Sequence, residues 1–226
     1  IHGKLITYMS FTALIPMRGG SKSIPNKNIK LFGGKPLCAW VLDAVKNSKF
    51  IDEIYVSSDS NRILEIVEKI NKKVNLLKRS PSLAKDKTST EEVMLDFASK
   101  FNFDNLVTLQ VTSPFTTSKD IDNAIKSFKQ EGMDSLFTSV RIKRFFWGDN
   151  MKPLNYNPRK RLMRQDFKGT LMENGAFYIT NRNVLSKYKC RLAGKIGSYE
   201  MPMINSMELD EIEDWKAMSK LIKKTR

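Results

Sequence analysis

The feature that most constrains the fold is a regular alternation along the first 140 residues of the chain. Short apolar runs typical of buried strands alternate with segments whose apolar residues recur every three or four positions, as in amphipathic helices. The expected strands are 12–15, 53–57, 74–77, 106–109, 136–140 and 176–180, and the expected helices begin near Leu37, Ile63, Val93, Ile121 and Ile212. This order predicts a three-layer, Rossmann-like α/β fold, with helices on both faces of a mostly parallel central sheet.

The chain is long enough for one domain with its own core, which we expect to span residues 12–226. Residues 1–11 are interpreted as an N-terminal extension left by cloning, without a function. The segment 141–172 breaks the alternation and is too long for an ordinary connection. It contains three consecutive aromatic residues, Phe145, Phe146 and Trp147, together with several arginines. This composition predicts that the segment 141–172 forms a homodimer interface. The alternative is a lid that folds back on the same chain.

Composition excludes several kinds of catalytic site. The single histidine is His2, and the two cysteines, Cys38 and Cys190, lie far apart in the chain. Histidine-dependent nucleophilic catalysis and zinc sites built from cysteine and histidine are therefore excluded. Any chemistry has to come from carboxylates, lysines, arginines and a metal with oxygen ligands.

The net charge of +15 raises the alternative of a nucleic-acid-binding protein, which would bind in a salt-sensitive way without turnover. The lysines are spread along the whole chain, however, which is typical of a solvated surface. No apolar run approaches the ~20 residues needed to span a bilayer, and the pattern of residues 1–11 leads us to expect no secretory signal. We therefore expect a cytoplasmic protein that binds neither membranes nor nucleic acids.

A glycine-containing basic loop, "MRGGSKSIPNKN", directly follows the first expected strand. Gly19 and Gly20 would let backbone N–H groups approach an anion, and nearby basic and hydroxyl side chains would add charge and donors. Ligands of parallel sheets bind beyond the carboxyl ends of the strands. The loop matches neither the P-loop nor the dinucleotide fingerprint. It predicts an anion site, with an ordinary surface turn as the alternative.

Two carboxylates near the C-terminus form the other candidate site. Glu208 and Asp210 in "SMELDEIED" are two residues apart, so on an extended segment they share one face while Leu209 points away. Such a pair suits Mg²⁺, although acidic residues also favour the start of the helix that follows. Asp59 in "VSSDSN" is interpreted as the N-cap of the second helix.

Seven segments occur in an order that resembles the acylneuraminate cytidylyltransferases, the CMP-sialic acid synthetases. They are "IPMRGGSKSIPNKNIKLFGGKPL", "VSSDS", "LLKRSPSLAKDKTST", "LQVTSPFTTSKDI", "RQD", "ENGAFYI" and "SMELD". The resemblance implies a nucleotidyltransferase fold. It also implies transfer of CMP from CTP to the anomeric 2-hydroxyl of a nine-carbon 2-keto-3-deoxy sugar acid, with release of pyrophosphate and with Mg²⁺ as cofactor.

The resemblance also implies roles for individual residues. The nucleotide would be bound by Arg18, Gly20, Ser21, Lys22, Lys27, Asn28, Arg79 and Thr90. The sugar would be bound by Gln110, by Tyr178 and by Arg164 from the neighbouring subunit of a homodimer. Glu208 and Asp210 would hold the metal, and the catalytic residues would be Arg18, Lys22 and Asp210.

Four positions depart from the family pattern, and one of them is Val111, which replaces a usual proline. Ser23 stands where a glycine is usual, and Glu208 stands where an aspartate is usual. Met172 stands where sialate enzymes often have an arginine, whereas members that use legionaminic acid can have methionine there. The acceptor is therefore expected to be N-acetylneuraminate or legionaminate, with a lean to legionaminate. Kdo and pseudaminate are the alternatives.

Overall fold

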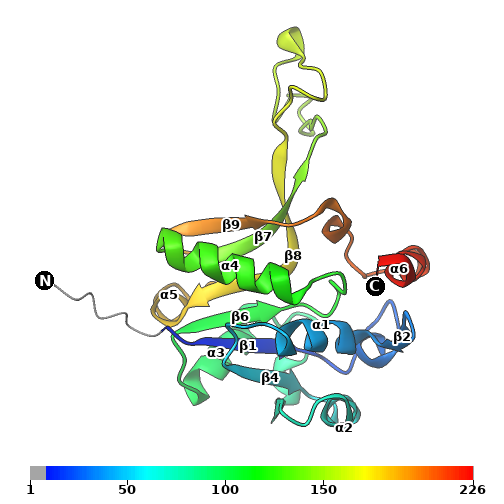
Figure 1. The fold of residues 1–226 in the computed structure, drawn as a ribbon, viewed down its shortest axis with the longest axis vertical. Coiled ribbons are helices and arrows are strands. Elements are labelled where there is room, and N and C mark those ends of the chain that lie inside the picture. Colours follow the sequence, from blue (N-terminus) through cyan, green and yellow to red (C-terminus); the bar gives the residue numbers. More distant parts are fainter. Residues whose placement is uncertain (1–8, 226) are drawn as a thin grey trace, which may run out of the picture.

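A seven-stranded sheet in the order β5-β4-β1-β6-β8-β7-β9 forms the centre of the computed structural model, which describes residues 9–225 (Figure 1). The strands are β1 (Phe11–Pro16), β4 (Glu53–Ser58), β5 (Asn75–Lys78), β6 (Asn105–Leu109), β7 (Ser135–Ile142), β8 (Thr170–Asn181) and β9 (Ile196–Glu200). The strands β5, β4, β1 and β6 are mutually parallel, and β9 is parallel to β7. Only β8 runs antiparallel to its neighbours within this sheet of the described chain. The predicted mostly parallel sheet is confirmed.

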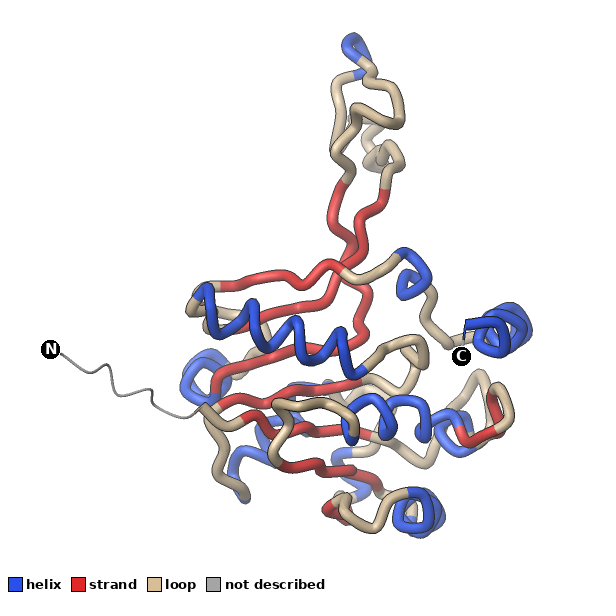
Figure 2. Tube along the Cα trace, in the orientation of Figure 1, coloured by secondary structure: helices blue, strands red, loops and turns tan. Residues whose placement is uncertain are grey.

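Helices cover both faces of this sheet, as predicted (Figure 2). They are α1 (Leu37–Lys46), α2 (Asn61–Ile70), α3 (Thr90–Lys100), α4 (Ser118–Glu131), α5 (Arg182–Tyr188) and α6 (Ile212–Thr225). The larger core contains buried residues of α1, α2, α4 and α6, and the smaller core contains those of α3 and α5. None of the helices in the described part of the chain is long and apolar enough to cross a membrane.

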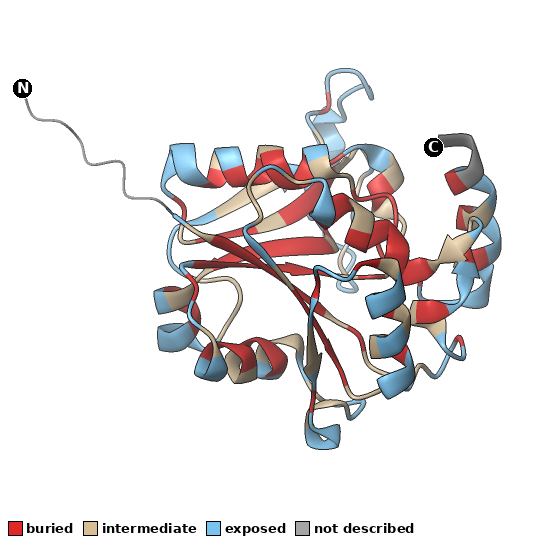
Figure 3. Cartoon of the chain, turned by 60° about the horizontal axis from the view of Figure 1, so that its bottom comes forward, coloured by how far each residue is buried: buried red, intermediate tan, exposed pale blue. Residues whose placement is uncertain are grey.

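Strand β1 shows why the sheet needs helices on both sides. Ala13 and Ile15 point into the larger core and Leu14 into the smaller one, and all three have no solvent-exposed area. Successive side chains of a strand point to opposite faces, so an unbroken apolar run is stable only between two layers. Figure 3 shows the buried residues along the strands and on the sheet-facing sides of the helices.

Two larger elements and one small hairpin escaped the sequence prediction. Strand β9 lies at the edge of the sheet and is only partly buried, and α5 buries only Val184 and Leu185. Their apolar patterns are therefore too weak to indicate them. The small hairpin pairs β2 (Leu31–Phe32) with β3 (Lys35–Pro36). Pro36 is the N-cap of α1.

The segment 141–172 belongs to a long hairpin that projects from the body of the molecule (Figure 1). Strands β7 and β8 run out of the sheet, and residues 139–142 still pair with 170–173. The register shifts between Phe137 and Ser139, which is where the two strands leave the plane of the sheet. We call residues 139–173 the arm, and the loops 143–169 form its tip.

The arm has a small aromatic core of its own. Phe145 stacks on Tyr156 with ring centroids 4.1 Å apart and contacts Phe167 at 4.9 Å. Phe146 and Trp147, by contrast, remain 38% and 51% exposed. Of the three consecutive aromatics, therefore, the arm itself covers one and leaves two at its surface.

Candidate functional site

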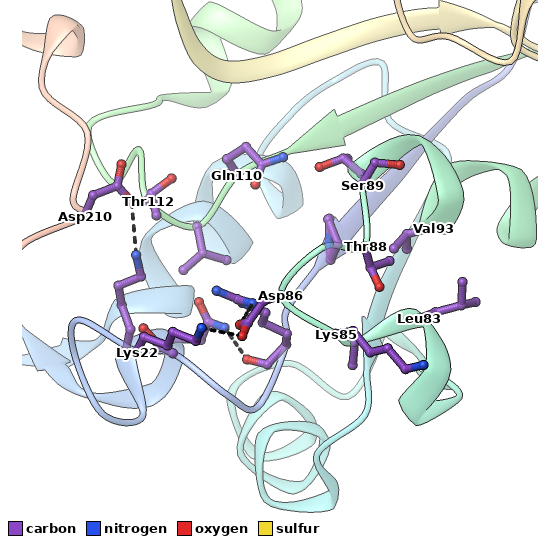
Figure 4. A pocket seen from close by; sticks show the side chains of 18 of the residues that line it. Lys22, Leu83, Lys85, Asp86, Thr88, Ser89, Val93, Gln110, Thr112 and Asp210 are labelled. Atoms are coloured by element: carbon purple, nitrogen blue, oxygen red, sulfur yellow. Dashed lines mark hydrogen bonds and ion pairs between the residues drawn. The ribbon is translucent and has the colours of Figure 1, made fainter.

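A cleft of about 580 Å³ lies at the carboxyl ends of β1, β5 and β6 (Figure 4). All of the predicted nucleotide-binding residues except Gly20 line it, together with Gln110 and Asp210. Further lining residues are Pro16, Ser23, Leu83, Ala84, Lys85, Asp86, Thr88, Ser89, Val93, Val111, Thr112 and Glu211. The structure thus brings most of the predicted site residues, from distant parts of the sequence, into one cavity.

The basic loop 17–28 is held at both ends. The backbone N–H of Met17 donates to the carbonyl of Ser57 in β4 at 2.8 Å. At the other end, the side-chain amide of Asn28 donates to the carbonyl of Arg18 at 2.9 Å. Gly20 is exposed, and a Cβ built there would meet no atom within 4 Å. The loop therefore presents an open, polar surface from a fixed base.

Asp59 stabilises this loop from the neighbouring strand. Its carboxylate accepts a hydrogen bond from the backbone N–H of Gly19 at 2.8 Å. The N-cap of α2 is Ser60, whose hydroxyl accepts from the N–H of Ile63. The interpretation of Asp59 as the N-cap is therefore wrong by one residue. The N–H of Gly19 is therefore occupied by the carboxylate of Asp59 and is not available to an anionic ligand.

Lys27 joins the basic loop to the C-terminal carboxylates. Its ammonium donates to the carbonyl of Leu209 at 3.0 Å and pairs with the carboxylate of Asp210 at 3.1 Å. The hydroxyl of Ser23 donates to the backbone carbonyl of Asp210. Ser23 thus adds a bond between the two halves of the site.

The carboxylate pair has the arrangement that its spacing predicted. Leu209 is fully buried, whereas Glu208 and Asp210 on either side of it are exposed. Although Glu208 has exposed surface, its carboxylate is partly withdrawn from solvent, and this desolvation raises its pKa; the negative charges of Asp210 and Glu173 raise it further. Carboxylates that repel one another in this way would be stabilised by a bound cation.

The close fit of Glu208 depends on a glycine in β8. Gly175 has a φ of +63°, and a Cβ at this position would lie 2.9 Å from a carboxylate oxygen of Glu208. The positive φ favours glycine at this position, and the carboxylate of Glu208 lies close to where a Cβ would be. Within residues 9–225, no three or more His, Cys, Asp or Glu residues are grouped so as to hold a metal. A cation bound here would therefore need further ligands from a substrate.

Arg79 is a buried cation at the end of β5. It is 5% exposed, and its Nε has no hydrogen-bond partner within the described structure. Burial lowers its pKa, and the nearby charge of Asp59 opposes this effect. A buried guanidinium that is incompletely paired is costly unless an anion compensates it. Its position in the cleft wall suits an anionic ligand.

Asp86 is a site residue that the sequence reasoning missed. Its carboxylate contacts the guanidinium of Arg18 at 2.8 Å and the ammonium of Lys22 at 2.6 Å (Figure 4). These contacts hold the pKa of Asp86 below its usual range, mainly through the hydrogen bond from Lys22. Its signal in the sequence was a single acid between lysines in "SLAKDKTST".

The predicted sugar-binding residues lie in three different places. Gln110 lines the cleft. Tyr178 pairs with Thr108, two residues before Gln110, so it faces the same side of the sheet as Gln110 but does not line the cleft. Arg164 is exposed on the arm and does not line the cleft of its own chain.

Tyr178 is enclosed by charged neighbours. It is 5% exposed, and its hydroxyl donates to the carboxylate of Glu173 at 2.5 Å. The guanidinium of Arg191 lies 4.7 Å from its ring centre and pairs with Glu91 in α3. Burial raises the pKa of Tyr178, and its bond to Glu173 raises it further. The phenol therefore remains neutral.

Comparison with known proteins agrees with this architecture. The N-acylneuraminate cytidylyltransferase A of Danio rerio is 35% identical over 212 residues, which cover 90% of this chain and 49% of that protein. The CMP-N,N'-diacetyllegionaminic acid synthase of Legionella pneumophila is 29% identical over 236 residues, covering 95% of this chain and 97% of that protein. This chain thus spans about half the length of the N-acylneuraminate cytidylyltransferases that it matches.

A solved structure of CMP:2-keto-3-deoxy-manno-octonic acid synthetase complexed with CTP has the same fold. It superposes with a TM-score of 0.72 at 16% identity, covering 96% of this chain and all of that one. The cytidylyltransferase family model matches residues 12–223, nearly the whole described chain. This protein therefore belongs to the cytidylyltransferase family.

Proposed function

We propose that this protein transfers CMP from CTP to the anomeric 2-hydroxyl of a nonulosonic acid and releases pyrophosphate. The observation that carries the proposal is the cleft itself, where the basic loop, the buried Arg79 and Asp210 line one cavity of about 580 Å³. Support also comes from relatives named N-acylneuraminate cytidylyltransferase and CMP-N,N'-diacetyllegionaminic acid synthase.

The basic side of the cleft would bind the nucleotide. Arg18 and Lys22 would contact its phosphates, since both are exposed cations on a loop whose base is anchored. An anionic part of CTP would compensate the buried positive charge of Arg79. The remaining nucleotide contacts are assigned to Gly20, Ser21, Lys27, Asn28 and Thr90.

Cytidylyltransferases of this kind generally use a divalent metal, and we propose Mg²⁺ held by Glu208 and Asp210. The donor set fits, because Mg²⁺ takes few protein carboxylates and completes its shell with water and substrate phosphates. The charges of Asp210 and Glu173 that raise the pKa of Glu208 also favour a cation here. When bound, Mg²⁺ would neutralise phosphate charge during the transfer.

In the proposed reaction, the sugar 2-hydroxyl oxygen forms a bond to the α-phosphorus of CTP, and its proton passes to solvent water. The bond from that phosphorus to the bridging oxygen breaks, and pyrophosphate leaves with the electron pair. Negative charge grows on the leaving group, and Arg18 and Lys22 would stabilise it. Lys27 would keep Asp210 beside the loop through its ion pair.

The sugar would lie against Gln110 and Tyr178. Arg164 would reach the sugar from the partner subunit of a homodimer, because it lies on the projecting arm away from its own cleft. The exposed Met172 on the arm favours legionaminate over N-acetylneuraminate as the acceptor. Kdo and pseudaminate are the alternatives, and we place the reaction in the cytoplasm.

A panel of sugar acids tests the proposed function. Purified protein with CTP and Mg²⁺ would be offered N-acetylneuraminate, legionaminate, pseudaminate and Kdo, and pyrophosphate release would be measured. UTP in place of CTP, and the Asp210→Asn variant, serve as controls. We expect release with one nonulosonic acid. No release with any acid, together with salt-sensitive binding to nucleic acid, would reject the proposal and favour the nucleic-acid-binding alternative.

A further inference from the structure

We propose that Asp86 is a displaceable counter-ion that holds Arg18 and Lys22 in their phosphate-binding positions until the nucleotide replaces it. This inference rests on the proposed function. It adds to that function a positioning residue that exchanges places with the substrate.

The geometry makes Asp86 a mimic of a phosphate group. One of its carboxylate oxygens contacts Arg18 at 2.8 Å and the other contacts Lys22 at 2.6 Å. Two cations on a loop are therefore bridged by the two oxygens of a single anion. Phosphate oxygens would take the same donors, so a bound polyphosphate and Asp86 compete for them.

The segment that carries Asp86 contributes no buried side chain to the core. None of residues 80–92 is buried, whereas Arg79 before them and Val93 after them are. The segment is anchored at its ends, by the bond from the N–H of Arg79 to the carbonyl of Ser58 and by the capping box of Ser89 with Glu92. Displacing Asp86 would therefore expose no core.

The strength of the contacts also suits exchange. The side chains of Arg18, Lys22 and Asp86 are 40%, 78% and 50% exposed, and ion pairs at such exposure are weak. They can orient two flexible side chains and still yield to an anion that carries several charges. After the transfer, the same carboxylate would compete with pyrophosphate for the two cations and so speed its release.

Binding of inorganic pyrophosphate to wild type and Asp86→Asn, measured by calorimetry without metal, tests this inference. Because the amide no longer competes as an anion, we expect Asp86→Asn to bind pyrophosphate about three- to tenfold more tightly. Added salt should reduce this difference. In turnover, the KM for CTP should fall while inhibition by pyrophosphate becomes stronger.

Two further variants sharpen the result. Asp43→Asn is the matched control, since Asp43 is 45% exposed and pairs with Lys35 but does not line the cleft. It should leave pyrophosphate affinity unchanged. In an Arg18→Ala background, Asp86→Asn should tighten binding less, because one of the two bridged cations is absent.

Unchanged or weaker pyrophosphate binding by Asp86→Asn would overturn the inference, and weaker binding would place Asp86 in the bound state instead. A wild-type protein without measurable pyrophosphate affinity would overturn it as well. The proposed function fails separately, through absent turnover with CTP and every sugar acid, because pyrophosphate binding requires no sugar.

Discussion

The carboxylate of Asp59 accepts a hydrogen bond at 2.8 Å from the backbone N–H of Gly19. This bond joins the end of β4 to the basic loop after β1, two segments 40 residues apart in the sequence. A Cβ at Gly19 would lie 3.0 Å from the Cβ of Ser60, so the loop packs closely on the start of α2. The path of the loop is thus determined by its neighbour strand as well as by its own glycines.

Replacing Asp59 with alanine should loosen the loop while the fold persists. The lost hydrogen bond is worth about 1 kcal/mol, which corresponds to about a fivefold rise in the Kd for CTP if the loop must re-form on binding. Asp59→Asn keeps an oxygen acceptor and should remain close to wild type. Calorimetry with CTP measures the affinity of both variants. An alanine variant that binds CTP as tightly as wild type would show that Asp59 does not position the loop.

Arg18→Ala and Lys22→Ala should each weaken CTP binding. A charge-assisted contact to phosphate is worth about 1.5–3 kcal/mol, which is about 10- to 150-fold in Kd. Unfolding free energies should stay close to wild type, because neither side chain is buried. Lys46→Ala, an exposed lysine at the end of α1, is the matched control. Unaltered CTP affinity in both loop variants would show that the phosphates bind elsewhere.

Asp210→Asn should lower turnover about 100-fold or more if this carboxylate holds the metal. In the absence of metal, its stability should change by less than about 1 kcal/mol, since the pair with Lys27 is largely exposed on the Asp210 side. Glu213→Gln, an exposed acid in the first turn of α6, is the control and should remain active. A fully active Asp210→Asn enzyme would exclude a metal role for this residue.

The raised pKa of Glu208 predicts how stability depends on pH. The folded state keeps this proton to higher pH than the unfolded state, so wild type loses stability as pH rises above the ordinary pKa of 4.5. Stability stops falling once the pH exceeds the raised pKa of Glu208. Without metal, Glu208→Gln should therefore match wild type at low pH and be more stable near neutral pH.

Thermal unfolding of wild type and Glu208→Gln across this pH range, with a chelator present, measures the effect. Glu211→Gln, a neighbouring exposed acid, is the comparison. Adding Mg²⁺ at neutral pH should remove the advantage of Glu208→Gln, because the cation stabilises the ionised carboxylate. An advantage that is the same at every pH would show that the charge of Glu208 is not its origin.

The arm should form the homodimer interface. The arm projects from the body of the molecule, so its own chain covers little of its apolar surface. The exposed apolar side chains of the arm are Phe146, Trp147, Met151, Leu154, Leu162 and Met163. Trp147→Glu should therefore shift the protein from dimer to monomer, and turnover should fall if Arg164 acts across the interface. Leu31→Glu, an exposed apolar site in β2, is the control. Light scattering that finds wild type monomeric at tens of micromolar would reject the dimer.

The layered fold and the basic side of the site were predictable from local sequence patterns. Apolar runs such as 106–109 and helical repeats such as that after Leu37 are local patterns, and their alternation constrains the topology. The basic loop after the first strand and the alternating burial around Leu209 were predictable for the same reason. Each is encoded within a few neighbouring residues.

Tertiary structure alone decided which distant charges meet. Asp86 bridges Arg18 and Lys22 across 64 or more residues, and Lys27 reaches Asp210 across 183. No local pattern indicates such pairs, because they depend on how strands from distant parts of the chain are ordered in the sheet. The antiparallel insertion of β8 is of the same kind, since it places Gly175 against Glu208. Local propensity selects the elements, and the packing of the sheet selects their neighbours.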